Sequence, residues 1–210
     1  EAMRQAPDEV TYSTLVNIFA RASAVDRAVD WLESMEASSC PPNIVACSSL
    51  VQAYAKTTAI DEAVQSLDII KAKGLRADKV LYATVLNASA RASRVEDAMA
   101  LIERMRKEAI RPDVVCHGSV MNGLARRGDP EGACRWLQSM EEESCQPNIV
   151  VFANAFQACA AARPPRIDLA EWLLERMHRH NLRPDGRLNA LLGRLLGPRF
   201  SEQPLQRVNR

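Results

Sequence analysis

The apolar positions of this chain recur with a helical spacing, and the whole pattern returns every 35 residues. Each return is marked by a proline or alanine followed by an aspartate or asparagine, and the last interval is two residues longer. The markers are Pro7-Asp8, Pro42-Asn43, Ala77-Asp78, Pro112-Asp113, Pro147-Asn148 and Pro184-Asp185. A fixed period of this length is typical of stacked supersecondary units. The sequence therefore predicts five repeats at 9–43, 44–78, 79–113, 114–148 and 149–185, with 1–8 as the end of a preceding repeat and 186–210 as a partial or capping repeat and C-terminal tail.

Two helices fit into each repeat. The second half of each repeat has two apolar residues three positions apart, as on the core side of a helix. These pairs are Leu32 and Met35, Leu67 and Ile70, Ile102 and Met105, Leu137 and Met140, and Leu174 and Met177. Small residues recur at Ala20, Ala55, Ala90, Ala125 and Ala160 and again at Ala28, Ala63, Ala98, Ala133 and Ala170, where they allow close helix packing.

From these positions we expect the first helix of each repeat, helix A, at about 10–22, 45–57, 80–92, 115–127 and 150–162. The second, helix B, is expected at about 25–37, 60–73, 95–108, 130–142 and 167–180, with a last helix A at about 186–196. The two extra residues of the fifth repeat fall near 163–166, between its helices. One hairpin cannot bury its apolar face alone, so neighbouring hairpins must stack. The fold class predicted is an all-α solenoid of tandem helix-turn-helix repeats.

One face of helix A has an unusual composition. The second, fifth, ninth and thirteenth residues of a repeat share this face because of their helical spacing. The second residues are Val10, Val45, Val80, Val115 and Val150; the fifth are Ser13, Ser48, Ala83, Gly118 and Ala153. The ninth are Asn17, Gln52, Asn87, Asn122 and Gln157; the thirteenth are Arg21, Lys56, Arg91 and Arg126, with Ala161 in the fifth repeat. Apolar edges, amides and a row of cations suit a groove that packs bases and meets phosphates.

Each of these features also has a purely structural explanation. Aspartate or asparagine before a helix is an ordinary N-cap, which contributes ~1 kcal/mol. The amides could form a hydrogen-bonded ladder between stacked helices, the valines could pack hairpins together, and the cations could form a solvated face. These alternatives predict different exposures for the same side chains.

Composition and charge agree with a helical protein that has two different faces. The chain is 5% aromatic with 8 Gly, which favours helices over sheets. The formal net charge is only +1, but Lys and Arg outnumber Asp and Glu in the helix A halves of the repeats, while acids outnumber them in the helix B halves. The distribution of charge, rather than its sum, decides whether a polyanion can bind.

Motifs for chemistry are not found in the sequence. The six cysteines form no Cys-x-x-Cys, so neither a zinc site nor a disulfide framework is indicated, and a reducing compartment fits them. There is no His-x-Glu with a later Cys-x-x-Cys, no glycine-rich phosphate loop and no Gly-x-Ser-x-Gly. The pair His178 and His180 is expected at an exposed helix end. No stretch of 18 apolar residues occurs. We therefore predict no enzyme activity, cofactor, metal or membrane for these residues, and we expect Glu1 to lie at the edge of a longer chain.

The repeat resembles the pentatricopeptide repeat. The likeness is carried by the 35-residue period, by segments such as Asp-Val-Val-Cys-His-Gly-Ser-Val-Met-Asn-Gly-Leu-Ala-Arg-Arg-Gly-Asp (113–129), and by an alanine-containing second helix ending in Met and Pro-Asn. It covers nearly all of 1–196. The resemblance implies a right-handed superhelix with the A helices inside, which binds single-stranded RNA at one nucleotide per repeat in a mitochondrion or plastid.

The family also implies roles for individual residues. The fifth and last residues of a repeat read the base, the second sandwiches it, and a basic thirteenth meets phosphate. Ser13 with Asn43 resembles an adenine-reading pair, and Ser48 with Asp78 a guanine-reading pair. The remaining pairs, which lack the expected hydroxyl or amide at the fifth place, are Ala83 with Asp113, Gly118 with Asn148 and Ala153 with Asp185. The resemblance thus implies a weak preference for purines. In the partial sixth repeat Arg187 replaces the valine, which favours a capping role.

Two functions remain open from the sequence. One is sequence-selective binding of single-stranded RNA in organellar RNA processing, stability or translation. The other is a helical protein scaffold, such as a subunit of an organellar ribosome, with protein partners on the concave face or the helix B face.

Overall fold

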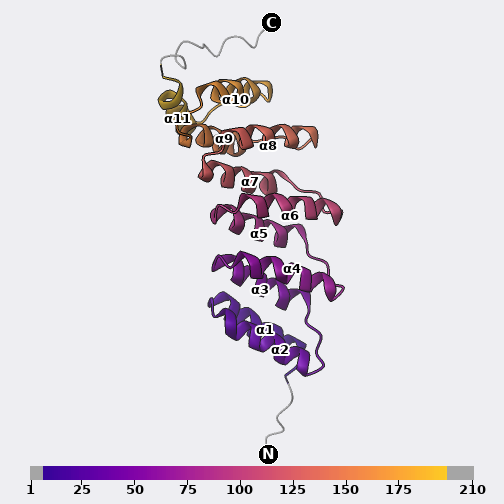
Figure 1. The fold of residues 1–210 in the computed structure, drawn as a ribbon. Coiled ribbons are helices and arrows are strands. Elements are labelled where there is room, and N and C mark those ends of the chain that lie inside the picture. Colours follow the sequence, from indigo (N-terminus) through magenta and orange to yellow (C-terminus); the bar gives the residue numbers. More distant parts are fainter. Residues whose placement is uncertain (1–6, 198–210) are drawn as a thin grey trace, which may run out of the picture. The chain divides into compact units, whose positions relative to one another are not determined.

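The computed structural model describes residues 7–197, and within that range the chain is built from eleven α-helices without a strand. In chain order they are α1 (Glu9–Arg21), α2 (Val25–Ala37), α3 (Ile44–Lys56), α4 (Ile60–Ala72), α5 (Lys79–Arg91), α6 (Val95–Lys107), α7 (Val114–Arg127), α8 (Pro130–Glu142), α9 (Ile149–Ala161), α10 (Ile167–Arg179) and α11 (Gly186–Leu196). Consecutive helices form hairpins (Figure 1). The all-α repeat architecture predicted from the sequence is confirmed.

The helix bounds agree with the expected ones to within about one residue, and the small difference at the A helices has a clear cause. The five A helices that begin the full repeats start one residue earlier than expected. The Asp or Asn that closes the preceding repeat is the N-cap, so the next residue is already helical. Most of the expected preceding repeat and of the C-terminal tail lies outside the described residues.

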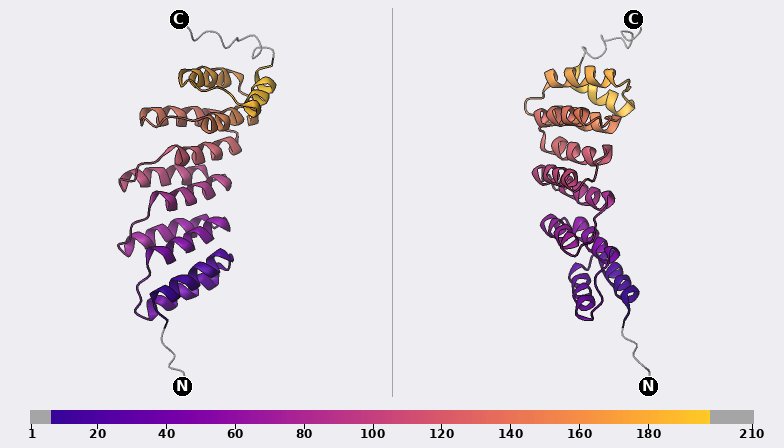
Figure 2. Two further views of the ribbon diagram at one scale, coloured as in Figure 1. Left: turned by 180° about the vertical axis from the view of Figure 1, so that it is seen from behind. Right: turned by 90° about the vertical axis from the view of Figure 1, so that its right-hand side faces the viewer.

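The chain divides into two compact units. The first consists of residues up to Ser89 together with Glu103–Arg111, and the second of Ala90–Ile102 together with the chain from Pro112. In the first unit α1 packs against α2 and α3, and α3 packs against α4. In the second unit α7 packs against α8 and α9, and α9 packs against α10 and α11. Within each unit, hairpin therefore lies on hairpin through contacts between successive A helices (Figure 2).

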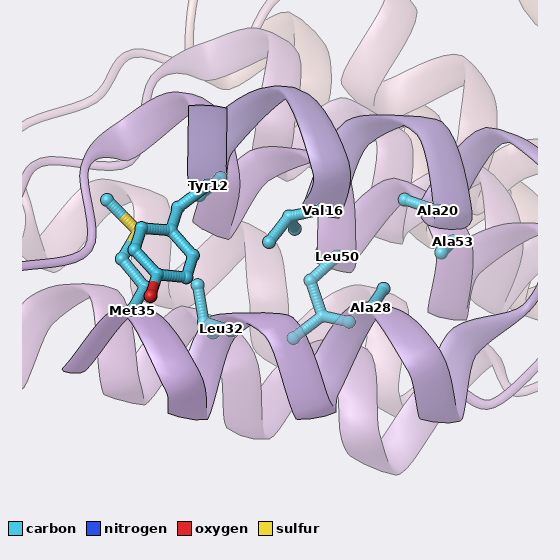
Figure 3. Packing of buried hydrophobic residues seen from close by; sticks show 9 residues of the cluster. Tyr12, Val16, Ala20, Ala28, Leu32, Met35, Leu50 and Ala53 are labelled. Carbon is cyan, nitrogen blue, oxygen red and sulfur yellow. The ribbon is translucent and has the colours of Figure 1, made fainter. Parts of the chain in front are cut away.

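The core follows the apolar stripes of the sequence. In the first hairpin Tyr12, Val16 and Ala20 of α1 form one buried cluster with Leu32 and Met35 of α2, and all five are at most 9% exposed. Met35 lies at the Tyr12 end of this cluster and Ala20 at the opposite end (Figure 3). Leu50 and Ala53 of α3 extend this cluster into the next hairpin. The expected core residues of helix B, from Leu32 and Met35 to Leu174 and Met177, are all buried, as are the recurrent alanines except the half-buried Ala160. The fixed alanines let helices approach closely while the methionines fill the remaining space.

Each helix B ends in the same turn. Two residues after the helix the backbone enters the left-handed region, at Ser39, Gly74, Ala109, Ser144 and Asn181. The N–H of the next residue then donates to the carbonyl five positions earlier, which belongs to the recurrent core residue of helix B, as from Cys40 to Met35 at 3.1 Å and from Ile110 to Met105 at 2.8 Å. This hydrogen bond is that of a Schellman motif, which satisfies a carbonyl left over at the helix end. The turn returns the chain toward the next N-cap.

The insertion of the fifth repeat is confined to its inter-helix loop, as expected. The segment between α9 and α10 spans residues 162–166, whereas 22–24 is enough in the first repeat. The backbone N–H of Arg166 donates to the carbonyl of Cys159 at 3.1 Å, which closes the longer loop on the end of α9. Helices α9 and α10 still pack against each other. The repeat thus absorbs two residues without losing its register.

Candidate nucleic-acid interface

The five valines at the second position of the repeats are exposed. Their exposed fractions are 71% for Val10, 53% for Val45, 66% for Val80, 62% for Val115 and 56% for Val150. The residue type is one that cores normally bury. The explanation that these valines pack hairpins together is therefore wrong, and the apolar surface they offer faces outward in the first turn of each A helix.

The Asp or Asn that closes a repeat caps the next A helix in every case. In each of them Oδ1 accepts a hydrogen bond from the backbone N–H three residues further along the chain, at 2.7 to 3.1 Å. The six residues are Asp8, Asn43, Asp78, Asp113, Asn148 and Asp185. Hydrogen bonds from the Thr11 side chain and backbone lower the pKa of Asp8. The structural role as N-cap is confirmed. Capping uses Oδ1 in all six residues, and in the first five it fixes the side chain near the exposed valine that lies two residues further along the chain.

The fifth and last residues of the first repeat lie in direct contact. Asn43 Nδ2 donates a hydrogen bond to Ser13 Oγ at 2.9 Å, and the Ser13 hydroxyl donates to the carbonyl of Glu9 at 2.8 Å. Ser13 is 8% exposed. The other fifth residues, Ser48, Ala83, Gly118 and Ala153, are half-buried at the same place in their helices. A polar pair whose members are 30 residues apart in the sequence is thus assembled, and Ser13 lies one helical turn after Val10 in α1.

The amides and cations on the same helix face point toward solvent. Gln52, Asn87 and Gln157 are exposed and the other two amides are half-buried. Among the described residues of each unit, no hydrogen bond joins two of these amides, so no amide ladder forms inside either unit. The four cations, Arg21, Lys56, Arg91 and Arg126, are all exposed in the last turn of helices α1, α3, α5 and α7. At that place they also complement the negative end of the helix dipole.

One residue of this surface was missed by sequence reasoning. The Glu9 carboxylate accepts a second hydrogen bond from Asn43 Nδ2, at 2.8 Å. A signal was present, because the first residue of the other repeats is Ile44, Lys79, Val114 or Ile149 and only here an acid. The first unit has an open hollow of about 400 Å³ there, which is lined by Glu9, Asn43, Pro41, Pro42, Lys73 and Leu75.

A second recurrent pair lies on the other side of helix A, where the fourth residue meets the thirtieth. Tyr12 is hydrogen-bonded to Ser38 at 2.8 Å between their hydroxyls, and Tyr82 donates to Glu108 at 2.8 Å. Burial and then this carboxylate raise the pKa of Tyr82. In the fifth repeat the corresponding contact is between rings, with the centroids of Phe152 and His180 6.0 Å apart.

The expectation that the two histidines near 180 mark an exposed helix end is wrong. Both are half-buried, and a ring nitrogen of His180 lies 2.7 Å from Glu141, which also pairs with Arg176. This ion pair ties α10 to the end of α8. The Arg176–Glu141 pair therefore joins two B helices and is not part of the exposed face of the A helices.

Within residues 7–197 no group of three or more His, Cys, Asp or Glu is arranged to hold a metal ion. In that same stretch, each helix is too short or too polar to cross a bilayer.

Comparison with known proteins agrees with the repeat. Models of the PPR repeat family match residues 7–56 and 77–126, and a model of the pentatricopeptide repeat domain matches 110–162. None of the curated protein sequences is significantly similar to this chain.

Solved structures share the fold. The maize pentatricopeptide repeat protein PPR10 superimposes with a TM-score of 0.70 at 25% identity over 93% of this chain, which spans 28% of that protein. PPR10 in complex with an 18-nt psaJ RNA element gives a TM-score of 0.63 at 21% identity over 93% of this chain and 32% of the other. The PPR domain of Arabidopsis thaliana protein-only RNase P 1, in complex with tRNA, gives 0.70 at 11% identity, with 93% and 99% of the two chains covered.

The family models together cover well over half of the sequence, and the all-α repeat fold agrees with them. This chain belongs to the pentatricopeptide repeat family.

Proposed function

We propose that this chain binds single-stranded RNA on the exposed face of its A helices, one nucleotide per repeat. The observation that carries the proposal is the row of five valines, each more than half exposed at the same place in its helix. Apolar side chains held outward in a helical turn cost solvation unless something covers them, and a nucleobase is a flat apolar surface of suitable size. The complexes of PPR10 with RNA and of the RNase P 1 domain with tRNA support this reading at the level of the fold.

In this proposal three groups of side chains have separate tasks. The valines sandwich bases, and the fifth and last residues, Ser13 with Asn43 and Ser48 with Asp78, contact base edges and favour purines. The cations at the thirteenth place meet phosphates, which gives affinity without sequence preference. Stacking contributes ~1–3 kcal/mol per base, from which the cost of ordering the strand is deducted. Five repeats alone therefore bind weakly, and the RNA target is read together with further repeats in a mitochondrion or plastid, in RNA processing, stability or translation.

The test is binding to a pool of single-stranded RNA over a series of salt concentrations. The wild-type chain is compared with a variant in which Arg21, Lys56, Arg91 and Arg126 are all changed to Ala. A control variant carries Ala in place of four exposed cations of B helices, at Arg27, Lys107, Arg135 and Arg179. Both variants lose the same charge, so only the position of the charge differs between them.

For about four phosphate contacts we expect a log-log salt slope of roughly −3. The helix A variant should lose most of this slope, whereas the helix B variant should keep it. A wild-type chain that is folded by circular dichroism and binds no RNA at low salt contradicts the proposal. The scaffold function, with a protein partner on the same face, then becomes the explanation to pursue.

A further inference from the structure

Both side-chain N–H groups of Asn43 donate hydrogen bonds to its own chain, and its Oδ1 accepts one. Oδ1 accepts the backbone N–H of Ala46 at 2.9 Å, which caps α3. The amide nitrogen carries two hydrogens, and it donates one hydrogen bond to Ser13 Oγ at 2.9 Å and one to Glu9 Oε1 at 2.8 Å. A base can therefore receive a hydrogen bond from this amide only if one of the present acceptors gives way.

Of the two acceptors, Glu9 is the one that can move. The Ser13 hydroxyl is buried and held by its own hydrogen bond to the Glu9 carbonyl, 2.8 Å away. The Glu9 side chain is exposed in the first turn of α1 and reaches Asn43 with its flexible end. In the other four repeats the first residue is isoleucine, lysine or valine, none of which can accept a hydrogen bond through its side chain.

We propose that Glu9 is a specificity-determining residue of the first repeat, because its carboxylate competes with an RNA base for the amide of Asn43. This inference rests on the proposed RNA-binding function. A base with a ring-nitrogen acceptor at this edge, as in adenine, must displace the carboxylate before Asn43 can donate to it. Glu9 therefore weakens the binding of adenine in the first repeat, although the other two residues of the site, Ser13 and Asn43, favour adenine.

Competition and charge repulsion are separable effects of the same side chain. The carboxylate also repels the phosphates of any bound strand, whatever its sequence. Glu9→Gln removes the charge but keeps an oxygen that accepts from Asn43. Glu9→Ala removes both. Glu33→Ala removes one exposed acid from α2, away from Asn43, and is the control for net charge.

The experiment measures the Kd of oligoadenylate and of oligouridylate for the wild type and these three variants at low and at high salt. We expect Glu9→Ala to tighten oligoadenylate binding about two- to fivefold, which is the effect of one exposed pair of this kind. The gain should persist at high salt and be smaller for oligouridylate. Glu9→Gln and Glu33→Ala should give only a salt-sensitive change that is alike for both oligomers.

A second background tests whether Asn43 is the group in competition. Asn43→Ser retains an N-cap for α3 but has no amide. In that background Glu9→Ala should no longer change the preference for oligoadenylate over oligouridylate. The side-chain amide signal of Asn43 in an NMR spectrum of the unbound protein should also shift in Glu9→Ala.

The outcomes separate the two proposals. RNA binding by the wild type with an unchanged adenine preference in Glu9→Ala overturns the role of Glu9 alone, as does an Asn43 amide signal that does not move. Absence of RNA binding by the wild type and all variants overturns the RNA-binding function and this role with it.

Discussion

The adjacent valines Val150 and Val151 allow stability and binding to be separated within one helix turn. Both lie at the start of α9, but Val150 is 56% exposed and Val151 is 1% exposed. Val151→Ala removes two buried methyl groups and leaves a cavity, so the free energy of unfolding should fall by about 2–3 kcal/mol. Val150→Ala loses less than half of the corresponding burial, and alanine's higher helix propensity returns about 0.5 kcal/mol. Its stability should therefore stay within about 0.5 kcal/mol of the wild type.

The two variants should behave in the opposite way toward RNA. If Val150 covers a base, its truncation removes about 1 kcal/mol of apolar contact, or roughly a fivefold rise in Kd. Val151→Ala should leave Kd unchanged at temperatures where the chain is folded. Urea unfolding followed by circular dichroism gives the first quantity, and fluorescence anisotropy with labelled RNA gives the second.

The reasoning is refuted by a particular pattern of results. Equal losses of stability in Val150→Ala and Val151→Ala would mean that the second-position valines pack between hairpins after all. Unchanged stability together with unchanged Kd in Val150→Ala would mean that the valine row is exposed but contacts no base. The same pair of measurements on Val115→Ala, which is 62% exposed, tests a second repeat of the same unit.

Three further outcomes are expected. Gly118→Ser should fold normally, because a Cβ there meets nothing nearer than 4.0 Å. It should also raise the preference of the fourth repeat for adenine, because it gives this repeat a serine and asparagine pair like Ser13 and Asn43. Unchanged selectivity in an RNA competition assay would count against a base-reading role of the fifth position. Thr58→Gly should raise the free energy of unfolding in urea by about 1 kcal/mol, because Thr58 has a φ of 59°, whereas Gly74→Ala, at a φ of 72°, should lower it by a similar amount. Because burial raises the pKa of the Cys134 thiol to about 11, brief treatment with N-ethylmaleimide near pH 7 should modify the half-buried Cys40 before Cys134, as read by mass spectrometry; faster labelling of Cys134 would contradict this.

The features that five repeats share could be predicted from the sequence. The core pair Leu32 and Met35 and its equivalents recur at one place, so chance matches are averaged away and the helix bounds follow to about one residue. The same averaging identified Val10 and its equivalents as a distinct set. Their exposure could not be derived from residue type, since valine is usually buried, and the structure was needed to decide between packing and display.

The features that differ between repeats could not be predicted in this way. The fourth and thirtieth residues meet through two hydroxyls at Tyr12 and Ser38 and through a phenol and a carboxylate at Tyr82 and Glu108. In the fifth repeat, where the insertion moves the equivalent place to the thirty-second residue, two rings meet at Phe152 and His180. The fourth residue is aromatic in these three pairs, but its partner is a hydroxyl, a carboxylate or an imidazole, so no common partner type marks the contact. Only coordinates show that the two places touch.

The same distinction bears on the proposed selection of RNA by this chain. Properties common to all repeats, such as the valine row, give each repeat the same contribution and so cannot tell one nucleotide from another. Selectivity must come from residues in which the repeats differ, and the fifth residues differ mainly by losing polar groups, at Ala83, Gly118 and Ala153. Two repeats retain a polar reading pair, Ser13 with Asn43 and Ser48 with Asp78, and in the first of them the Glu9 carboxylate accepts a hydrogen bond from Asn43. Because the carboxylate lies in the first turn of α1, it acts on this repeat alone, and one substitution there should change the preference at one nucleotide without altering the rest of the surface.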